Sequence, residues 1–218
     1  MNEPEPVSTE QLTVAQWVAK LSQATGLPGG GAGSAVMLSV AAGLICMVAG
    51  YSEDADASGE AMRIKRRGQI LRTESLRLAD EDASCSESFG QAFHTPSGPA
   101  RSMRICAAAL NAARSSADIG RHAAAGLNDL HWLSEHGNPA LIADLAVLLG
   151  ALRASISGSR ANIYFDLSTM QAHRDSERPA EEPADLYGTI ERLDRALVRI
   201  DQLSAQLDTR IRNLLPDS

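Results

Sequence analysis

The sequence predicts an all-α fold, a multi-helical bundle with long antiparallel helices. Apolar residues recur at three- and four-residue steps in several long segments, which is the pattern of one helix face. No segment has the alternating apolar and polar pattern of a convincing strand. Aromatic residues make up only 4% of the 218 residues, and alanine is abundant, which indicates closely packed helices with small side chains. We expect one domain over residues 1–218.

A first helix is expected near the N-terminus. Ser8 and Gln11 have the spacing of a capping box, in which two side chains help to satisfy the free N–H groups of a helix start. Gly26 suits the end of this helix, because glycine readily adopts the backbone conformation of a C-cap. Four apolar residues have the spacing of one helix face: Val14, Trp17, Val18 and Leu21.

A glycine-rich loop precedes the second expected helix. It comprises Leu27, Pro28, Gly29, Gly30 and Gly31. A loop of this kind is a candidate anion or oxyanion site, because the first N–H groups of a helix have no internal partner. The alternative is a tight turn that packs two helices closely. The chain has no G-x-x-x-x-G-K-[ST] pattern and no strand before the glycines, which excludes a common nucleotide-binding loop.

The stretch between Lys20 and Glu53 is uncharged and long enough for a membrane span to be considered. The glycine-rich loop interrupts it, and acidic rather than basic residues follow it. We therefore expect no membrane association. The segment from about Gly33 to Tyr51 is predicted to be a central helix surrounded on most sides, because it lacks a polar face.

Four further helices are expected along the chain. Proline and glycine mark the turns before and after the fourth helix, and Pro139 suits the first turn of the fifth. A polar linker with two prolines covers residues 175–185. The last helix has a leucine and isoleucine stripe that packs on the bundle or on a partner chain. The four helices are expected at about 57–93, 99–135, 139–166 and 186–214.

Composition and short motifs argue against several classes of protein. The net charge of −7 argues against a nucleic-acid binder, which needs a basic surface. The N-terminus is acidic and has no signal-peptide pattern, so a cytoplasmic location is expected. The three cysteines form no C-x-x-C pair and the five histidines form no H-E-x-x-H, so we expect no metal and no disulfide framework.

Several polar residues lie where a bundle core should be apolar. Asp144 is flanked by apolar residues, and a buried carboxylate is costly unless it is paired or used in function. The alternative is that Asp144 lies on the polar side of an amphipathic helix. Asn162 and Asp166 are four residues apart and share a helix face. Asn138 stands at a helix break, where capping is an equally good explanation.

A run of three acidic residues, Asp80, Glu81 and Asp82, falls within the third expected helix. A solvated acidic face is the ordinary explanation for such a run. The alternative is a carboxylate directed into a site.

The ordered motifs resemble the cyclodeaminase/cyclohydrolase family, which includes methenyltetrahydrofolate cyclohydrolases and the cyclodeaminase part of formiminotransferase-cyclodeaminase. The segment from Pro28 to Gly31 is similar to the family's T-P-G-G-G. Glu81-Asp82 before Pro96 looks like its acidic pair. Gly137-Asn138 with Asp144 resembles G-N-x-x-x-S-D, and Asn162 resembles the first asparagine of N-V-x-x-N. The resemblance covers about residues 10–215.

The chain departs from the family pattern at several points. Leu27 replaces the threonine, Ala143 replaces the serine before the aspartate, and Asp166 replaces the second asparagine of N-V-x-x-N. The aromatic expected just after the acidic pair is missing around Cys85 and Ser86. These departures concern the activity more than the fold.

The resemblance implies a homodimer that acts on a reduced folate, with no cofactor besides this tetrahydrofolate substrate. The expected activity is methenyltetrahydrofolate cyclohydrolase, which hydrolyses 5,10-methenyltetrahydrofolate to 10-formyltetrahydrofolate. Asp144 and Asp82 are the expected catalytic carboxylates, and Asp144 is favoured because its apolar neighbours should raise its pKa.

The same resemblance assigns substrate binding to Pro28, Gly29, Gly30, Gly31, Asn138, Asn162 and Asp166. Three alternatives remain open. These are a formimidoyltetrahydrofolate cyclodeaminase, a catalytically silent folate-binding relative, and a helical interaction protein.

Overall fold

The structure is a computed structural model that describes residues 8–25, 27–174 and 183–214. These residues form helices and turns and no strand, which confirms the predicted all-α bundle. Three short 3-10 turns cover Thr9–Gln11, Glu53–Ala55 and Pro139–Leu141. The helices are α1 (Val14–Leu21), α2 (Gly30–Gly50), α3 (Glu60–Phe93), α4 (Pro99–His136), α5 (Ile142–Ala172) and α6 (Ala184–Arg212).

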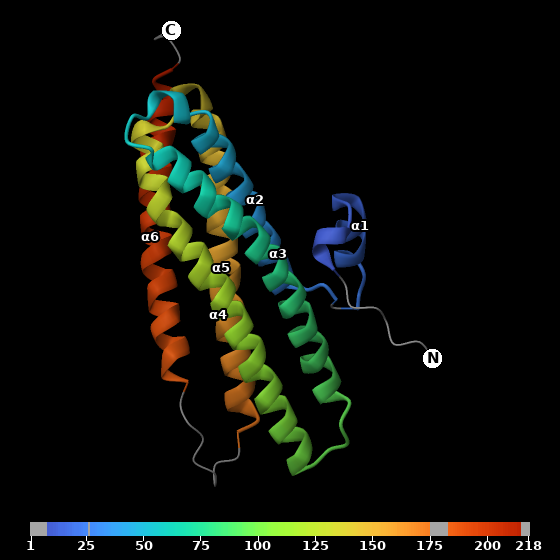
Figure 1. The fold of residues 1–218 in the computed structure, drawn as a ribbon. Coiled ribbons are helices and arrows are strands. Elements are labelled where there is room, and N and C mark those ends of the chain that lie inside the picture. The colour runs from blue at the N-terminus through green and yellow to red at the C-terminus, as the bar shows by residue number, and fades with distance from the viewer. Residues whose placement is uncertain (1–7, 26, 175–182, 215–218) are drawn as a thin grey trace.

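Five long helices form the bundle, and they alternate in direction along its axis (Figure 1). Helix α2 runs up, α3 down, α4 up, α5 down and α6 up in this view. The short helix α1 stands beside the bundle, near α2 and α3. The expected helix bounds agree with the structure to within about three residues for α2 to α4. Helix α5 starts later, because the residues from Pro139 to Leu141 form a 3-10 turn instead.

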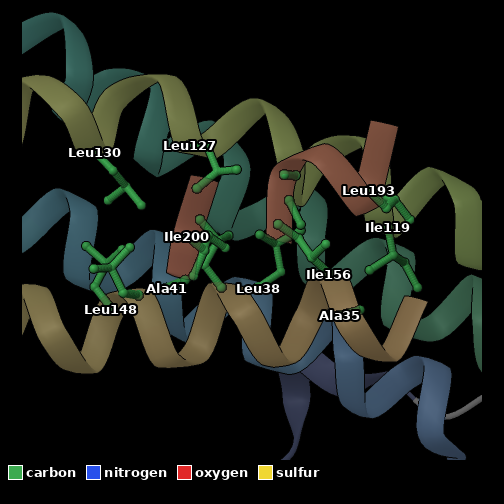
Figure 2. Close-up of a cluster of buried hydrophobic side chains, with 14 of the residues drawn as sticks. Ala35, Leu38, Ala41, Ile119, Leu127, Leu130, Leu148, Ile156, Leu193 and Ile200 are labelled. Carbon is green, nitrogen blue, oxygen red and sulfur yellow. The ribbon is translucent and has the colours of Figure 1, made fainter. Parts of the chain in front are cut away.

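Small side chains let the core helices approach closely. Figure 2 shows Ala35 and Ala41 of α2 lying among buried leucine and isoleucine side chains of α4, α5 and α6. A Cβ atom on Gly120 of α4 would lie 2.8 Å from Leu193 Cδ1 of α6 and 3.2 Å from Ser159 Cβ of α5. The alanine- and glycine-rich composition therefore sets the helix spacing, as the sequence predicts.

The start of the N-terminal helix differs from the prediction. The capping box joins Thr13 and Gln16, whose side chains each accept a hydrogen bond from the other residue's backbone N–H, at 3.3 and 2.9 Å. Ser8 instead precedes a 3-10 turn and makes no side-chain cap. The expected apolar face is only partly buried, since Trp17 is covered but Val14 is 81% exposed. The reason is that α1 stands outside the bundle. Gly26 lies outside the described residues.

Helices α2 and α5 are long and apolar enough to cross a membrane by length and composition. Half of the most apolar window of α2 is buried inside the bundle. The other half is at least partly exposed, which corrects the expectation that this helix is surrounded on most sides. Met37 and Val40 are exposed, and Leu44 and Met47 are half-buried on the same face of the helix. The described residues therefore leave an apolar stripe of α2 only partly covered.

Candidate functional site

A cavity of about 480 Å³ opens between the start of α2, the second half of α3, the first half of α4 and the last turns of α5. Five of the residues singled out from the sequence line it: Gly30, Gly31, Asp82, Asn162 and Asp166. These residues come from three helices and are up to 136 positions apart, so the bundle assembles the site. The other lining residues are Thr25, Leu27, Ser86, Glu87, Phe89, Gly90, Gln91, His94, Ala112, Ser116 and Phe165.

The acidic run on α3 separates into three different environments. Asp80 accepts hydrogen bonds from the backbone N–H and the hydroxyl of Thr9, at 2.7 and 2.6 Å. Glu81 forms an exposed ion pair with Arg77. Asp82 is only 4% exposed and lines the cavity. The ordinary explanation of a solvated acidic face is therefore wrong for Asp82, because its side chain turns towards α2.

The start of α2 receives the Asp82 carboxyl group. The backbone N–H of Ala32 and the hydroxyl of Ser115 interact with it, the latter at 3.5 Å from Oδ1. Its Oδ2 atom is buried and has no hydrogen-bond partner among the described residues. Burial raises the pKa of Asp82 to about 6, although the hydrogen bonds from Ala32, Ser115 and Ser86 act in the opposite direction.

Gly31 makes this approach possible. A Cβ atom at this position would overlap both Asp82 carboxylate oxygens and would lie 2.5 Å from Cγ. The glycine-rich loop thus accommodates a carboxylate of the same chain at the positive end of α2. This corrects the expectation that the whole loop offers N–H groups to a ligand. Pro28 is buried and Gly29 is the N-cap, and neither lines the cavity.

Asn162 and Asp166 lie one helical turn apart on α5 and both line the cavity, as their spacing predicts. Asn162 extends its Oδ1 atom to 4.0 Å from the Cβ position of Gly30. Asp166 is 7% exposed. Burial raises the pKa of Asp166 to about 7, and the negative charge of Asp82 acts in the same direction. Two buried carboxyl groups therefore share one cavity.

An aromatic cluster forms one wall of the cavity. Phe89 and Phe165 line the cavity, and Phe93 packs on Phe89 without lining it. The ring centroids of Phe89 and Phe93 are 5.3 Å apart, and those of Phe89 and Phe165 are 6.4 Å apart. The sequence analysis did not identify this wall. Its signal was the seven-residue step from Asp82 to Phe89, which is two helical turns and places both on one face of α3.

The side chains that line the cavity carry an excess of negative charge. Among the described residues that line it, Asp82, Glu87 and Asp166 are acidic, His94 is the one histidine, and none is a lysine or arginine. Such a cavity favours a ligand with positive charge, because a cation offsets the cost of burying carboxylates. Within the described ranges, no group of three or more histidine, cysteine, aspartate or glutamate side chains could hold a metal ion.

The structure does not bring Asp144 or Asn138 to this cavity within one chain. Asp144 is half-buried in the first turn of α5, and the 22 residues that separate it from Asp166 correspond to about 33 Å of helix. The burial that its apolar neighbours in sequence indicate is only partial, and its catalytic role stays a prediction. Apolar neighbours in sequence do not bury a residue whose own side of the helix is partly open.

Asn138 has the capping role that was its alternative. Its Oδ1 atom accepts a hydrogen bond from the Ala140 N–H at 3.0 Å, which stabilises the 3-10 turn before α5. Its backbone N–H donates to the buried Ser52 hydroxyl at 3.1 Å. Asn138 thus joins the α4–α5 connection to the second residue after α2, at the end of the bundle away from the cavity.

A family profile and a solved structure relate this chain to the same group of known proteins. The sequence profile of the formiminotransferase-cyclodeaminase family matches residues 13–183. The structure is similar to the crystal structure of formiminotetrahydrofolate cyclodeaminase from Thermotoga maritima, with a TM-score of 0.77 and 20% sequence identity over 93% of this chain and 98% of that chain. Among curated proteins, no sequence matches. Because the family profile matches well over half of its residues, the chain belongs to the formiminotransferase-cyclodeaminase family.

Proposed function

We propose that this protein is a formimidoyltetrahydrofolate cyclodeaminase, which closes 5-formimidoyltetrahydrofolate to 5,10-methenyltetrahydrofolate and releases ammonia. Membership of the family and the name of the Thermotoga maritima protein support this activity over the cyclohydrolase expected from the sequence. The observation that carries the proposal is a buried carboxyl pair, Asp82 and Asp166, beside an aromatic wall in a cavity whose described lining residues include no lysine or arginine.

The aromatic wall suits the flat bicyclic ring of a reduced folate. Stacking on Phe89 or Phe165 stabilises such a ring by about 0.5–1.5 kcal/mol beyond the burial of its surface. The amides of Asn162 and Gln91 and the hydroxyl of Ser116 line the same space and would supply hydrogen bonds to the ring edge. The cavity volume of about 480 Å³ is in the ordinary range for small-molecule sites.

The carboxyl pair suits the charge of the one-carbon unit. A protonated formimidoyl group is an amidinium cation, and so is the methenyl bridge of the product. A nearby carboxylate stabilises both cations, and it also stabilises the approach of N10 to the formimidoyl carbon. Ring closure forms the N10–carbon bond and breaks the bond from that carbon to the departing nitrogen. One proton must leave N10 and one must reach that nitrogen, which a carboxyl pair can provide.

Cyclohydrolysis of 5,10-methenyltetrahydrofolate is the second candidate. Water would add to the same amidinium carbon, and the same carboxyl pair would remove and return protons. The prediction from the sequence motifs favours this reaction, whereas the named structural relative favours deamination.

A two-arm assay tests the proposal. In the first arm, purified protein receives 5-formimidoyltetrahydrofolate, and both the methenyl absorbance and the released ammonia are measured. In the second arm, it receives 5,10-methenyltetrahydrofolate, and the loss of absorbance is compared with a blank at the same pH. Acceleration in the first arm that Asp82→Asn reduces by at least about 100-fold supports the cyclodeaminase. Acceleration in the second arm alone would replace it with the cyclohydrolase.

Asp144→Asn belongs in the same assay because the sequence favoured this carboxylate. Within one chain the residue lies about 33 Å along α5 from Asp166. A large loss of turnover in this variant, with unchanged folding, would require a second copy of the chain to bring Asp144 to the cavity.

We propose that the protein is a homodimer, as the family resemblance implies, and that the apolar stripe of α2 takes part in its interface. Met37, Val40, Leu44 and Met47 make this stripe, and the described residues of the single chain cover it only in part. Exposed apolar patches of this kind are typical of protein interfaces. Light scattering of the purified protein gives its mass, and Val40→Glu should convert a dimer to a monomer. A monomeric wild type would reject the proposal.

A further inference from the structure

Asp166 distinguishes the cavity of this chain from the family pattern. The family pattern to which Asn162 belongs has an amide where this chain has Asp166. An asparagine there would face Asp82 as a neutral hydrogen-bond donor. Asp166 instead places a second ionisable group in the same cavity, within the electrostatic influence of Asp82. This cavity therefore holds either two buried negative charges or a pair of carboxyl groups with one proton between the two of them to distribute.

The surroundings favour the shared proton. Asp82 and Asp166 are 4% and 7% exposed, and no lysine or arginine among the lining residues offsets their charge. Two desolvated carboxylates in one site cannot both ionise cheaply at neutral pH. Among the described residues, the other titratable side chains that line the cavity are Glu87 and His94 of α3, and the Cys85 thiol of the same helix lies within the electrostatic influence of both carboxyl groups. The lining residues from α2 and α4 are glycine, alanine and serine, which do not titrate in this range.

The hydrogen bonds indicate which carboxyl group carries the proton. Asp82 accepts from the Ala32 N–H and the Ser115 hydroxyl at the positive end of α2, and these donors stabilise its ionised form. Within the described part of the chain, no protein group donates a hydrogen bond to Asp166. The pKa of Asp166 is raised to about 7 and that of Asp82 to about 6, which agrees with this order. The hydrogen bonds to Asp82 therefore favour Asp166 as the member that carries the proton.

We propose that Asp82 and Asp166 share one proton and act as a catalytic pair, in which Asp166 is the acid and Asp82 is the base. This assignment rests on the proposed cyclodeaminase function for its chemistry, but the sharing of the proton does not. Asp82 takes the proton that N10 loses as the N10–carbon bond forms. Asp166 gives its proton to the departing nitrogen, which leaves as ammonia when its bond to carbon breaks. The pair ends with one proton on Asp82, so the number of protons on the pair is unchanged.

The first test measures the proton without any substrate. Infrared difference spectra of the ligand-free protein, recorded between about pH 5 and 9, detect the C=O stretch of a protonated carboxyl group. We expect a protonated-carboxyl band that titrates near neutral pH in the wild type and is absent in Asp166→Asn. Asp118→Asn is the matched control, because Asp118 is a half-buried residue of α4 that lies outside the cavity and pairs with Arg121. A wild type with no such band above about pH 5.5 would overturn the shared proton.

The second test measures the role of the proton in turnover. Asp166→Asn keeps the size of the side chain and resembles the family pattern but cannot release a proton. We expect its kcat to fall by about 100-fold or more, with a smaller effect on KM. The alkaline fall of the wild-type kcat profile should disappear in this variant, which a purely structural role would not cause. A kcat profile in which the alkaline fall remains in Asp166→Asn would overturn the assignment of the acid. The same holds for a protonated-carboxyl band that remains in Asp166→Asn and is lost in Asp82→Asn.

The two tests separate this inference from the proposed function. A protonated-carboxyl band that depends on Asp166, together with no turnover of either folate, would retain the shared proton and reject the cyclodeaminase. Turnover without the band would retain the enzyme and reject the pair.

Discussion

The contact between Gly31 and Asp82 provides a stringent test of the site geometry. In Gly31→Ala, the new Cβ atom would overlap both oxygens of the Asp82 carboxyl group and would lie 2.5 Å from its Cγ atom. An ordinary contact between such atoms is at least about 3.4 Å, so the carboxyl group or the start of α2 must shift by about 1 Å. The carboxyl group cannot move freely, because it is buried between α2 and α4.

Two opposing effects set the expected change in stability. Overpacking of a buried site costs about 1–3 kcal/mol. Replacement of glycine by alanine inside a helix recovers up to about 1 kcal/mol, and less in the first turn. The net loss should therefore be about 1–2 kcal/mol, which lowers Tm by about 2–8 °C in a chain of this size. The displaced Asp82 carboxyl group should also reduce turnover by about 100-fold.

The assay combines thermal unfolding by circular dichroism with folate turnover. Gly188→Ala is the matched control, because this glycine also lies inside a helix and its nearest neighbouring atom would be 3.8 Å from the new Cβ. We expect the control to keep wild-type turnover and to unfold at the same or a higher temperature. If Gly31→Ala behaved like this control in both measurements, the close approach of Asp82 to α2 would be refuted.

Three further predictions concern stability. Ser52→Ala should lower the free energy of unfolding by about 1–3 kcal/mol, because it removes the hydroxyl that accepts from the backbone N–H of Asn138 at 3.1 Å. Urea unfolding measures this change, and a loss under about 0.3 kcal/mol would contradict it. Leu148→Ala should cost about 2–5 kcal/mol because the side chain is fully buried among α2, α4 and α5, and calorimetry that finds less than about 1 kcal/mol would reject this packing. The raised pKa of Asp166 means that the folded state binds more protons than the unfolded state between about pH 4 and 7, so stability falls as pH rises through this window. Between about pH 5 and 8 the titration of Asp166 should lower the free energy of unfolding by about 1–2 kcal/mol, after allowance for water in the open cavity. If the free energy of unfolding changed equally with pH in the wild type and in Asp166→Asn, this prediction would be wrong.

The helices of the bundle were predictable because their signals are local. The turns at Pro96–Pro99 and Gly137–Pro139 separate segments whose apolar residues repeat with helical spacing, and the structure has breaks between helices at both places. The least accurate prediction was at the N-terminus, where Ser8 and Thr13 both start a plausible capping box. Sequence spacing alone does not decide between two such boxes, and the structure selects Thr13.

The principal carboxylate was harder to predict than the fold. Asp144 has more apolar neighbours in sequence than Asp82, yet Asp82 is the buried one. Burial depends on which side of a helix meets other helices, and a local stretch of sequence does not contain that information. Asp82 turns towards the start of α2, where Gly31 leaves space for it. The first turn of α5 leaves Asp144 partly open.

The amino-acid sequence alone is sufficient to predict an all-α bundle, its turns, the family and the shared helix face of Asn162 and Asp166. Their spacing reflects the helical repeat, which depends on nearby residues. The cavity itself depends on how α2, α3, α4 and α5 pack, because its carboxyl groups and phenylalanine rings come from different helices. Their meeting is a long-range property of helix packing, and so are the burial and raised pKa values of Asp82 and Asp166.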